Sequence, residues 1–162
     1  MFFEKLKNYN VLLASGSKRR HQLLSQLGVE FKIINSCVDE SFSNNLKSSE
    51  ITDYLAKKKS SILVKNLKKN DLLITSDTIV WHKKTALGKP KNRNEAFEMI
   101  KSLENSSHEV ITSICISTLN FQITVNETTL VYFENFDNND LLYYTNTYDV
   151  LDRAGGYGIQ DY

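Results

Sequence analysis

Hydrophobic positions at the start of the chain follow first the pattern of a buried strand and then the pattern of a helix. Residues 11–15 form an apolar run that ends in serine, and residues 18–27 carry leucines at helical spacing. The leucines expected on one side of this helix are Leu23, Leu24 and Leu27. Gly28 follows directly, and a glycine in that place is typical of a helix end. The chain therefore begins with a predicted strand and helix.

The pattern then alternates between polar and apolar positions before a second helical stretch begins. Residues 29–34 alternate as a strand, and the segment after them is a polar loop that includes residues 39–40 and 43–45. Loops of this kind often carry functional side chains. Residues 49–67 place apolar side chains at helical spacing, so we predict a long helix there.

The middle of the chain combines a short strand with a well-marked helix start. Residues 72–75 predict a strand, which would place Asp77 at its carboxyl end. Ligand sites of open α/β sheets lie at such strand ends, although an aspartate there can also form an Asx-turn. Asn92, followed three residues later by Glu95, resembles a capping box and predicts that a helix begins at this point.

The last third of the chain predicts strands, one more helix and a turn. Residues 108–133 are rich in Val, Ile, Thr and Tyr, which favours a β-meander or hairpin with turns near Asn120 and Asn126. A helix over residues 138–145 leads into a glycine-rich turn over residues 154–158. Taken together, the pattern predicts an α/β fold, a single domain over residues 1–162 with a central mixed sheet flanked by helices.

Composition narrows the class of protein further. The chain has 162 residues, with 20 Lys and Arg against 19 Asp and Glu, so its formal net charge is +1. The net charge is therefore too small to attract nucleic acid or a membrane surface through the electrostatic field of the whole protein. Cys37 and Cys115 lack the spacing of a metal or disulfide pair, which fits free, buried thiols in a reducing compartment. No signal peptide or membrane span is evident, so we expect a cytoplasmic protein.

Residues 15–20 read Ser-Gly-Ser-Lys-Arg-Arg, between the first predicted strand and helix. Three consecutive cations in the first turn of a helix lie at the positive end of its dipole, where each destabilises the helix by roughly 0.3–1 kcal/mol. Their placement makes sense if an anion binds there, because a helix N-terminus presents unpaired N–H groups to such a ligand. The segment is therefore a candidate anion site.

Other chemistry is poorly supported by the residues. The string over residues 88–90 lacks the hydroxyl residue that a P-loop requires after its lysine, and no serine has the pattern of a nucleophile elbow. The three histidines, His21, His82 and His108, are too scattered for a metal pair on one helix. His108 is better explained as a structural residue. Carboxylates, cations and small hydroxyls are the candidates that remain.

Seven strings, in order along the chain, resemble the Maf family of nucleoside triphosphate pyrophosphatases. They are residues 13–20, Asp39-Glu40, residues 55–59, Ser76-Asp77-Thr78, residues 87–90, residues 108–112 and residues 154–160. Each string is short, but their common order over most of the chain makes chance a poor explanation. The resemblance implies a Maf/ITPase-like fold and hydrolysis of a nucleoside triphosphate to its monophosphate and pyrophosphate. Such activity would remove unwanted nucleotides from the pool.

The resemblance also implies roles for individual residues. The positions that match phosphate-binding residues of the family are Ser15, Arg20, Lys59 and Lys89. Glu40 and Asp77 match the acidic pair that would hold a divalent cation, Mg²⁺ or Mn²⁺, and Asp77 is the expected catalytic base. The spacing of the residues leaves open how base and ligand roles divide between these carboxylates. A homodimer is a further implication, and the sequence leaves the oligomeric state open.

Base selectivity is implied by three more positions, Arg19, Thr78 and Gln160. Neighbouring helix residues point about 100° apart, so Arg19 and Arg20 cannot both grip one phosphate in the same way. Relatives that prefer methylated guanine nucleotides have Trp at the Arg19 position, so Arg19 resembles the branch that acts on dTTP and UTP. Pairing of Thr78 and Gln160 with a pyrimidine edge would discriminate against other bases.

The chain departs from the family pattern in three places. Lys18 stands where a proline usually opens the helix, and Asp161 replaces the usual glycine after Gln160. The sequence ends at Tyr162, where relatives continue into further sheet and helix structure, so we expect a domain shortened at its C-terminus. A non-catalytic nucleotide-binding protein linked to cell division, as the family's septum-related name suggests, is the alternative function. A nucleic-acid-binding module is less well supported, because aromatic and basic residues do not interleave on the predicted strands.

Overall fold

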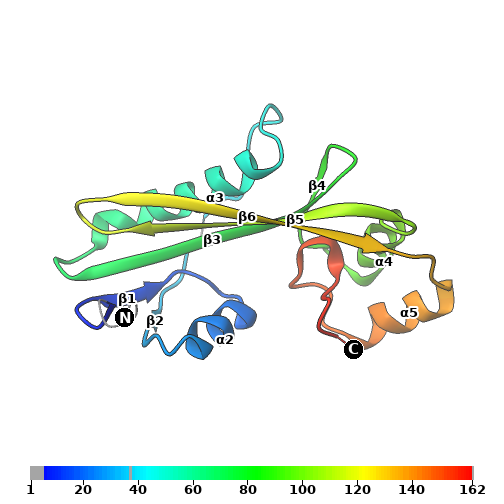
Figure 1. Ribbon diagram of the computed structural model, residues 1–162, viewed down its shortest axis with the longest axis horizontal. Helices are drawn as coiled ribbons and strands as arrows, with labels where there is room; N and C mark the ends of the chain where they lie inside the picture. The colour runs from blue at the N-terminus through cyan, green and yellow to red at the C-terminus, as the bar shows by residue number, and fades with distance from the viewer. Residues whose placement is uncertain (1–5, 37, 162) are drawn as a thin grey trace. The chain divides into compact units, whose positions relative to one another are not determined.

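The computed structural model describes residues 6–36 and 38–161, which form an α/β protein (Figure 1). The elements in chain order are β1 (Asn10–Leu13), α2 (Lys18–Gln26), β2 (Lys32–Ile33), α3 (Ser49–Leu63), η1 (Val64–Asn66), β3 (Asp71–His82), β4 (Thr85–Leu87), α4 (Arg93–Ser102), β5 (Ser106–Ser117), β6 (Gln122–Phe133), α5 (Asn138–Thr147) and η2 (Ala154–Gly156). No helix in the described part of the chain is both long and apolar enough to cross a membrane.

The strands form one mixed sheet in the order β2-β1-β3-β5-β6, with β4 paired to β3. β1 runs parallel to both β2 and β3, whereas β3 and β4 are antiparallel. β5 and β6 are joined by a tight turn in which the Thr118 N–H donates to the Phe121 carbonyl over 2.9 Å. The predicted α/β class with a mixed sheet is confirmed.

The chain separates into two compact units, which we describe one at a time. The first comprises Met1–Asp77 and Ser113–Asn126, and the second comprises Thr78–Thr112 and Glu127–Tyr162. β3, β5 and β6 each contribute residues to both units. The single domain expected over residues 1–162 stays a prediction.

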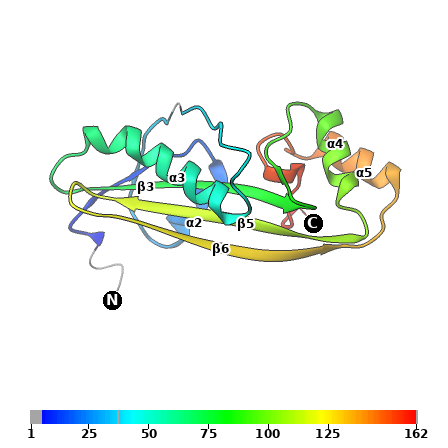
Figure 2. The same ribbon diagram turned by 90° about the horizontal axis from the view of Figure 1, so that it is seen from above.

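In the first unit, α2 and α3 cover opposite faces of the sheet. Leu72 of β3 packs with Val11 of β1 and with Leu24 of α2, whereas Thr75 of β3 donates a hydrogen bond of 2.8 Å to the Ala56 carbonyl of α3. Because successive side chains of a strand point to opposite faces, Asp77 shares the face of Thr75. Figures 1 and 2 show α3 running along β3, so Asp77 is directed toward this helix.

Small polar groups join α3 to the sheet in place of a purely apolar contact. The Ser60 and Ser117 hydroxyls lie 2.6 Å apart, and the Ser113 hydroxyl donates to the Thr52 hydroxyl over 2.6 Å. These four residues are buried, and hydrogen-bonded partners offset the cost of burying them. Such directional contacts fix the register of α3 on the strands, and with it the place of every α3 side chain that faces the sheet.

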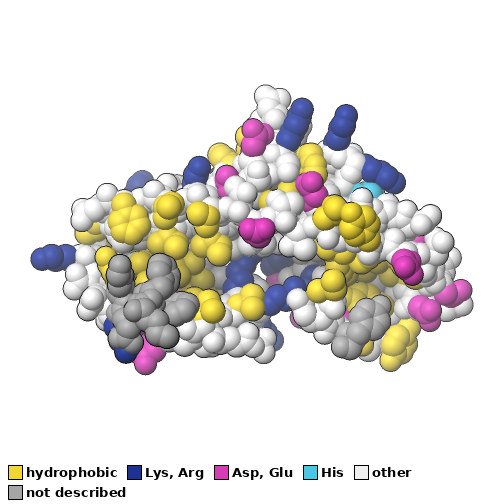
Figure 3. Space-filling view, viewed as in Figure 1, with side chains coloured by type: hydrophobic (Ala, Val, Ile, Leu, Met, Phe, Trp, Pro, Cys, Tyr) yellow, Lys and Arg dark blue, Asp and Glu magenta, His cyan; other side chains and the backbone are white. Residues whose placement is uncertain are grey.

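The outer face of β6 is apolar and exposed in the first unit. Ile123 and Val125 are 52% and 53% exposed, and they alternate with Gln122 and Asn126, which bond to side chains of α3. Figure 3 shows apolar side chains gathered over this end of the β5–β6 hairpin. β6 is the last strand of the sheet order, so its outer edge lies outside the core. The face that carries Ile123 and Val125 is directed away from α3 and does not position this helix.

In the second unit, α4 begins where the sequence predicts it and a glycine turn packs against the sheet. The Asn92 side chain accepts a hydrogen bond of 2.9 Å from the Glu95 N–H, as an N-cap residue does. Gly155 has a φ of +71°, and a Cβ at this position would lie 2.7 Å from Val80 Cγ2. Its N–H donates to the Gly88 carbonyl over 2.9 Å. Glycine is therefore required at position 155 both for the conformation and for the close approach.

The strand predicted before Asp77 was too short. The strand expected over residues 72–75 extends to His82, so Asp77 lies within β3 rather than at its carboxyl end. The run of Ser76, Asp77 and Thr78 resembles a turn in composition, but each of the three is tied to its surroundings by hydrogen bonds. The hairpin alternative predicted for residues 108–133 is confirmed over residues 106–133. The turn lies near Asn120 as expected, and there is none at Asn126, which lies inside β6.

The predicted helices are confirmed, with smaller differences at their faces and ends. α2 ends before Gly28, whose φ is +70°, but Leu23 and Leu27 are more than half exposed instead of buried. The strand expected over residues 29–34 is reduced to β2, Lys32–Ile33. The long helix expected over residues 49–67 ends as η1. Cys115 is a buried free thiol, and Cys37 lies outside the described residues.

Candidate functional site

The connection between β1 and α2 is folded around Ser15. The Ser15 hydroxyl accepts a hydrogen bond of 3.2 Å from the Ser17 N–H, and the Ser15 carbonyl lies 2.7 Å from His21 Nε2. These contacts hold the turn so that α2 begins at Lys18, without an acidic residue in its first turn. The positive end of the helix dipole is therefore not offset from within the helix, which suits the binding of an anion.

The adjacent arginines of α2 take different positions, as the helix geometry predicts. Arg20 is half-buried, and its guanidinium donates to the Ser76 carbonyl of β3 over 3.1 Å. Arg19 and Lys18 are exposed. Arg20 thus brings positive charge next to Asp77, and Arg19 does not share this contact.

Lys59 lies at the centre of a charged cluster in the first unit. Its Nζ is 2.6 Å from Asp77 Oδ1 and 2.8 Å from Glu40 Oε1, and it also lies 3.5 Å from the Ser76 carbonyl. The side chain is 8% exposed because Lys59 occupies the same face of α3 as Leu55, Ala56 and Ser60. Lys57, two positions earlier, is exposed. We call Lys59, Glu40 and Asp77 the carboxylate–lysine cluster.

Asp77 reaches this cluster from a strand interior. β1 pairs with β3 as far as Leu13 and Ile74, so Asp77 lies just beyond the point where β1 ends, on the neighbouring parallel strand. The site is therefore at the carboxyl end of β1. Burial raises the pKa of the Asp77 carboxyl, and the Glu40 carboxylate raises it further, while Lys59 and Arg20 act in the opposite direction.

The two carboxylates of the cluster suit a hard divalent cation that keeps other ligands. Among the described residues, no group of three or more His, Cys, Asp or Glu side chains forms a metal-binding set. Mg²⁺ is typically bound through one or two carboxylates together with water and substrate phosphates. Glu40 and Asp77 fit this mode. Glu40 would bind the cation from the solvent side, since its side chain is 61% exposed, and Asp77 from the buried side, since its side chain is 9% exposed.

The remaining predicted site residues belong to the second unit. The Thr78 and Thr112 hydroxyls lie 3.0 Å apart, and the Lys89 ammonium donates to the Asp152 carboxylate. Gln160 is exposed. The predicted residues therefore belong to both units. In the first unit, Lys59 contacts both Glu40 and Asp77, and Arg20 contacts the neighbouring Ser76 carbonyl.

A network around Gln160 was not predicted from the sequence. The Asp161 carboxylate accepts hydrogen bonds from the Arg153 guanidinium and from the Tyr144 hydroxyl, the latter at 2.6 Å. The Tyr144 hydroxyl in turn accepts a hydrogen bond of 2.9 Å from the Gly158 N–H. The only sequence signal was that an acid replaces glycine beside Gln160, and the structure shows that this acid is neutralised by Arg153.

His108 is a buried structural residue of the second unit. It is 2% exposed, its Nε2 lies 2.6 Å from the Tyr157 hydroxyl, and its ring packs edge-on against Phe133. Burial, with a smaller effect from His82, lowers its pKa to about 4. A neutral imidazole is therefore part of the packed unit.

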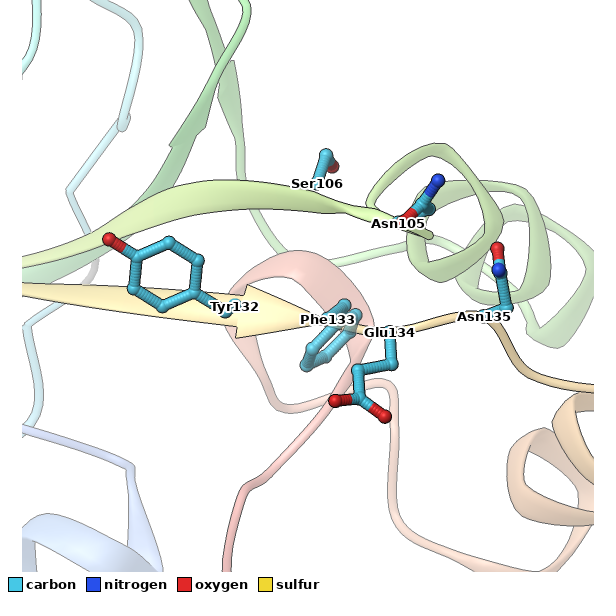
Figure 4. A pocket seen from close by; sticks show the side chains of 6 residues that line it. All are labelled: Asn105, Ser106, Tyr132, Phe133, Glu134 and Asn135. Carbon is cyan, nitrogen blue, oxygen red and sulfur yellow. The ribbon is translucent and has the colours of Figure 1, made fainter.

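A pocket of the second unit, which Phe133 also lines, contains none of the predicted site residues. It has a volume of about 550 Å³ and is lined by Asn105, Ser106, Tyr132, Phe133, Glu134 and Asn135. Figure 4 shows these side chains at the ends of β5 and β6, where they spread apart instead of converging on one point. This open hollow offers no set of groups that converge on a ligand.

The fold and the cluster together define an α/β protein whose site suits a phosphate anion and a divalent cation. The fold is similar to that of the Staphylococcus aureus Ham1 protein, with a TM-score of 0.54 and 15% identity over 75% of this chain and 70% of that chain. At this level of identity the likeness concerns the fold alone. It agrees with the predicted Maf/ITPase-like arrangement of strands and helices.

A family model described as Maf-like protein matches residues 10–162, and the chain belongs to this family. The chain is 46% identical to a dTTP/UTP pyrophosphatase of Flavobacterium johnsoniae, covering 100% of this chain and 84% of the relative. It is also 46% identical to a dTTP/UTP pyrophosphatase of Christiangramia forsetii, over 100% of this chain and 83% of that relative. The family resemblance carried by the seven strings is confirmed.

Proposed function

We propose that this protein is a nucleoside triphosphate pyrophosphatase that hydrolyses dTTP and UTP to the monophosphate and pyrophosphate. The observation that carries the proposal is the carboxylate–lysine cluster, in which Glu40, Lys59 and Asp77 meet beside the Arg20 contact. Membership of the Maf-like family and 46% identity to relatives named dTTP/UTP pyrophosphatase support the reaction and the bases. The activity would remove unwanted nucleotides from the pool.

In this proposal the phosphates are bound by cations and a hydroxyl. Arg20 and Ser15 belong to the β1–α2 connection, where helix N–H groups and the helix dipole favour an anion. Lys59 and Lys89 add two ammonium groups, since a triphosphate requires several charged donors. Arg19, Thr78 and Gln160 are proposed to select the base, and their exposed or hydroxyl-bearing side chains suit contacts to a pyrimidine edge.

Glu40 and Asp77 would hold the divalent cation, Mg²⁺ or Mn²⁺, through their carboxylate oxygens. When bound, such a cation offsets the negative charge that develops on the phosphate oxygens. Asp77 is the proposed base. Its carboxylate takes a proton from water as the water oxygen bonds to phosphorus and the bond to the pyrophosphate leaving group breaks. Burial raises the pKa of the Asp77 carboxyl, and a cation held by this carboxylate would act in the opposite direction.

The test is a product analysis with the purified protein. dTTP, UTP, CTP, GTP and ATP are each incubated with Mg²⁺ or Mn²⁺, and the products are separated by anion-exchange chromatography. The proposal expects pyrophosphate and the monophosphate, formed fastest from dTTP and UTP. Release of orthophosphate would contradict the bond assignment. Thermal stabilisation by dTTP without any turnover would favour a nucleotide-binding protein without catalytic activity.

A further inference from the structure

Lys59 occupies the place between the two carboxylates proposed to bind the cation. A single ammonium contacts Asp77 Oδ1 at 2.6 Å and Glu40 Oε1 at 2.8 Å. A divalent cation bound to the same two oxygens would need the position that this ammonium holds. The ammonium and a divalent cation repel each other at such distances, so both cannot share these oxygens without movement.

The surroundings of Lys59 explain how the ammonium is held there. Its stem passes along the sheet-facing side of α3, where Leu55, Ala56 and Ser60 are buried. Its ammonium contacts the two carboxylates of the cluster and the Ser76 carbonyl. Glu40 comes from the loop before α3 and its side chain is 61% exposed. Without a positive charge between them, Glu40 and the buried Asp77 would repel each other.

We propose that Lys59 is an internal counter-cation that competes with the divalent cation for Glu40 and Asp77 and is released to a substrate phosphate when the cation binds. This inference rests on the proposed function for the identity of the two cation ligands. The lysine side chain is long and flexible, so its ammonium can leave the carboxylates without movement of α3. Binding of the cation and binding of the nucleotide are then coupled, because a phosphate offers the displaced ammonium a new partner.

The decisive measurement is the affinity for Mn²⁺ without nucleotide. Free Mn²⁺ is quantified by its electron paramagnetic resonance signal during titration of the wild-type protein and of Lys59→Met, which keeps an unbranched side chain of similar length but removes the charge. We expect Lys59→Met to bind Mn²⁺ about tenfold more tightly, a typical coupling between two competing ligands. Equal or weaker binding by Lys59→Met would overturn the inference, because Lys59 would then only organise the carboxylates.

Lys57→Met is the matched control. It removes the same charge from the same helix, but Lys57 is exposed and belongs to no part of the proposed site. Its affinity for Mn²⁺ should equal that of the wild-type protein. An increase in Lys57→Met as large as in Lys59→Met would show a general charge effect and would also overturn the inference.

A second measurement uses the wild-type protein, in case Lys59→Met does not fold. Acetic anhydride acylates the neutral amine form of lysine, so the extent depends on how accessible each side chain is and how easily it loses its proton. Mass spectrometry of the peptides gives the extent at each lysine. Saturating Mn²⁺ should increase acylation of Lys59 severalfold and leave Lys57 unchanged. An unchanged extent at Lys59 would contradict its displacement.

These readouts are separate from turnover. If Lys59→Met binds Mn²⁺ more tightly but the wild-type protein releases no pyrophosphate, the proposed function is refuted and the competition is supported. If the wild-type protein releases pyrophosphate but the Mn²⁺ affinity of Lys59→Met is unchanged, the proposed function is supported and the competition is refuted.

Discussion

The two units each contain a lysine proposed to bind phosphate, and the two lysines are held in different ways. Lys59 is paired with Asp77 in the first unit, and the two side chains are 8% and 9% exposed. Lys89 is paired with Asp152 in the second unit, and these side chains are 58% and 47% exposed. An exposed pair contributes about 0–1 kcal/mol, whereas removal of one partner from a buried pair leaves a charge without compensation. The stability of the first unit thus depends on the pairing of Lys59 with Asp77, whereas loss of the exposed Lys89–Asp152 pair should change the stability of the second unit little.

The largest expected effect concerns the buried carboxylate of the first unit. Asp77→Asn keeps the size of the side chain but removes the proton acceptor and one anionic oxygen beside Lys59. We expect pyrophosphate release to fall by about 10²–10⁴-fold, the usual contribution of a general base. Near-normal turnover in a coupled pyrophosphate assay would rule out Asp77 as the base. Asp152→Asn is the matched change in the exposed pair, and its thermal midpoint should shift only slightly.

The next effect separates the two kinds of ion pair within the second unit. Arg153 and Asp161 have side chains that are 17% and 10% exposed, so their pair is largely desolvated. Asp161→Asn should therefore destabilise the protein by about 3 kcal/mol. Asp152→Asn, in the exposed pair with Lys89, should cost less than about 1 kcal/mol. Urea unfolding of both variants measures the difference, and similar free energies of unfolding would refute the contrast.

A smaller effect distinguishes the adjacent arginines of α2. Arg20→Gln removes the guanidinium that donates to the Ser76 carbonyl, and should lower kcat/KM about tenfold to a hundredfold for every nucleotide, since charged hydrogen bonds contribute about 1.5–3 kcal/mol. Arg19→Gln should instead change the ratio between UTP and the purine nucleotides. Equal losses across all nucleotides in Arg19→Gln would remove its proposed role in selecting the base.

The elements were predictable from the sequence where local signals decide them. The Asn92 cap, the end of α2 at Gly28 and the hairpin turn near Asn120 each depend on residues that are close together along the chain. Asp77 was expected at a strand end because the strand-like run covers only residues 72–75. The hydrogen bonds that tie Ser76, Asp77 and Thr78 to their surroundings come from Arg20, Lys59 and Thr112, which are distant in the sequence.

The candidate site was predictable only in part for the same reason. The run over residues 57–59 consists of three lysines and gives no sign of which one is buried. The face of α3 that packs on the sheet is determined by contacts such as that of Ser60 with Ser117. The family resemblance singled out Lys59, whereas its contacts with both Glu40 and Asp77 required the structure. The Arg153–Asp161 pair had no sequence pattern that could reveal it.

The smallest effect is a pH dependence of stability in the second unit. Burial lowers the pKa of His108 to about 4, whereas the unfolded chain binds the same proton near its ordinary pKa of 6.5. The contribution of neutral His108 is therefore fully present above about pH 6.5 and is lost as the pH falls from there toward 4, because the unfolded state binds more protons in that range.

His108→Phe removes this titration and keeps an aromatic ring against Phe133 and Tyr157. The loss of thermal stability between pH 7 and pH 5 should be smaller in His108→Phe than in the wild-type protein, as measured by differential scanning calorimetry at constant ionic strength. Equal losses in the two proteins would mean that His108 takes up its proton without disturbing the packed aromatic cluster.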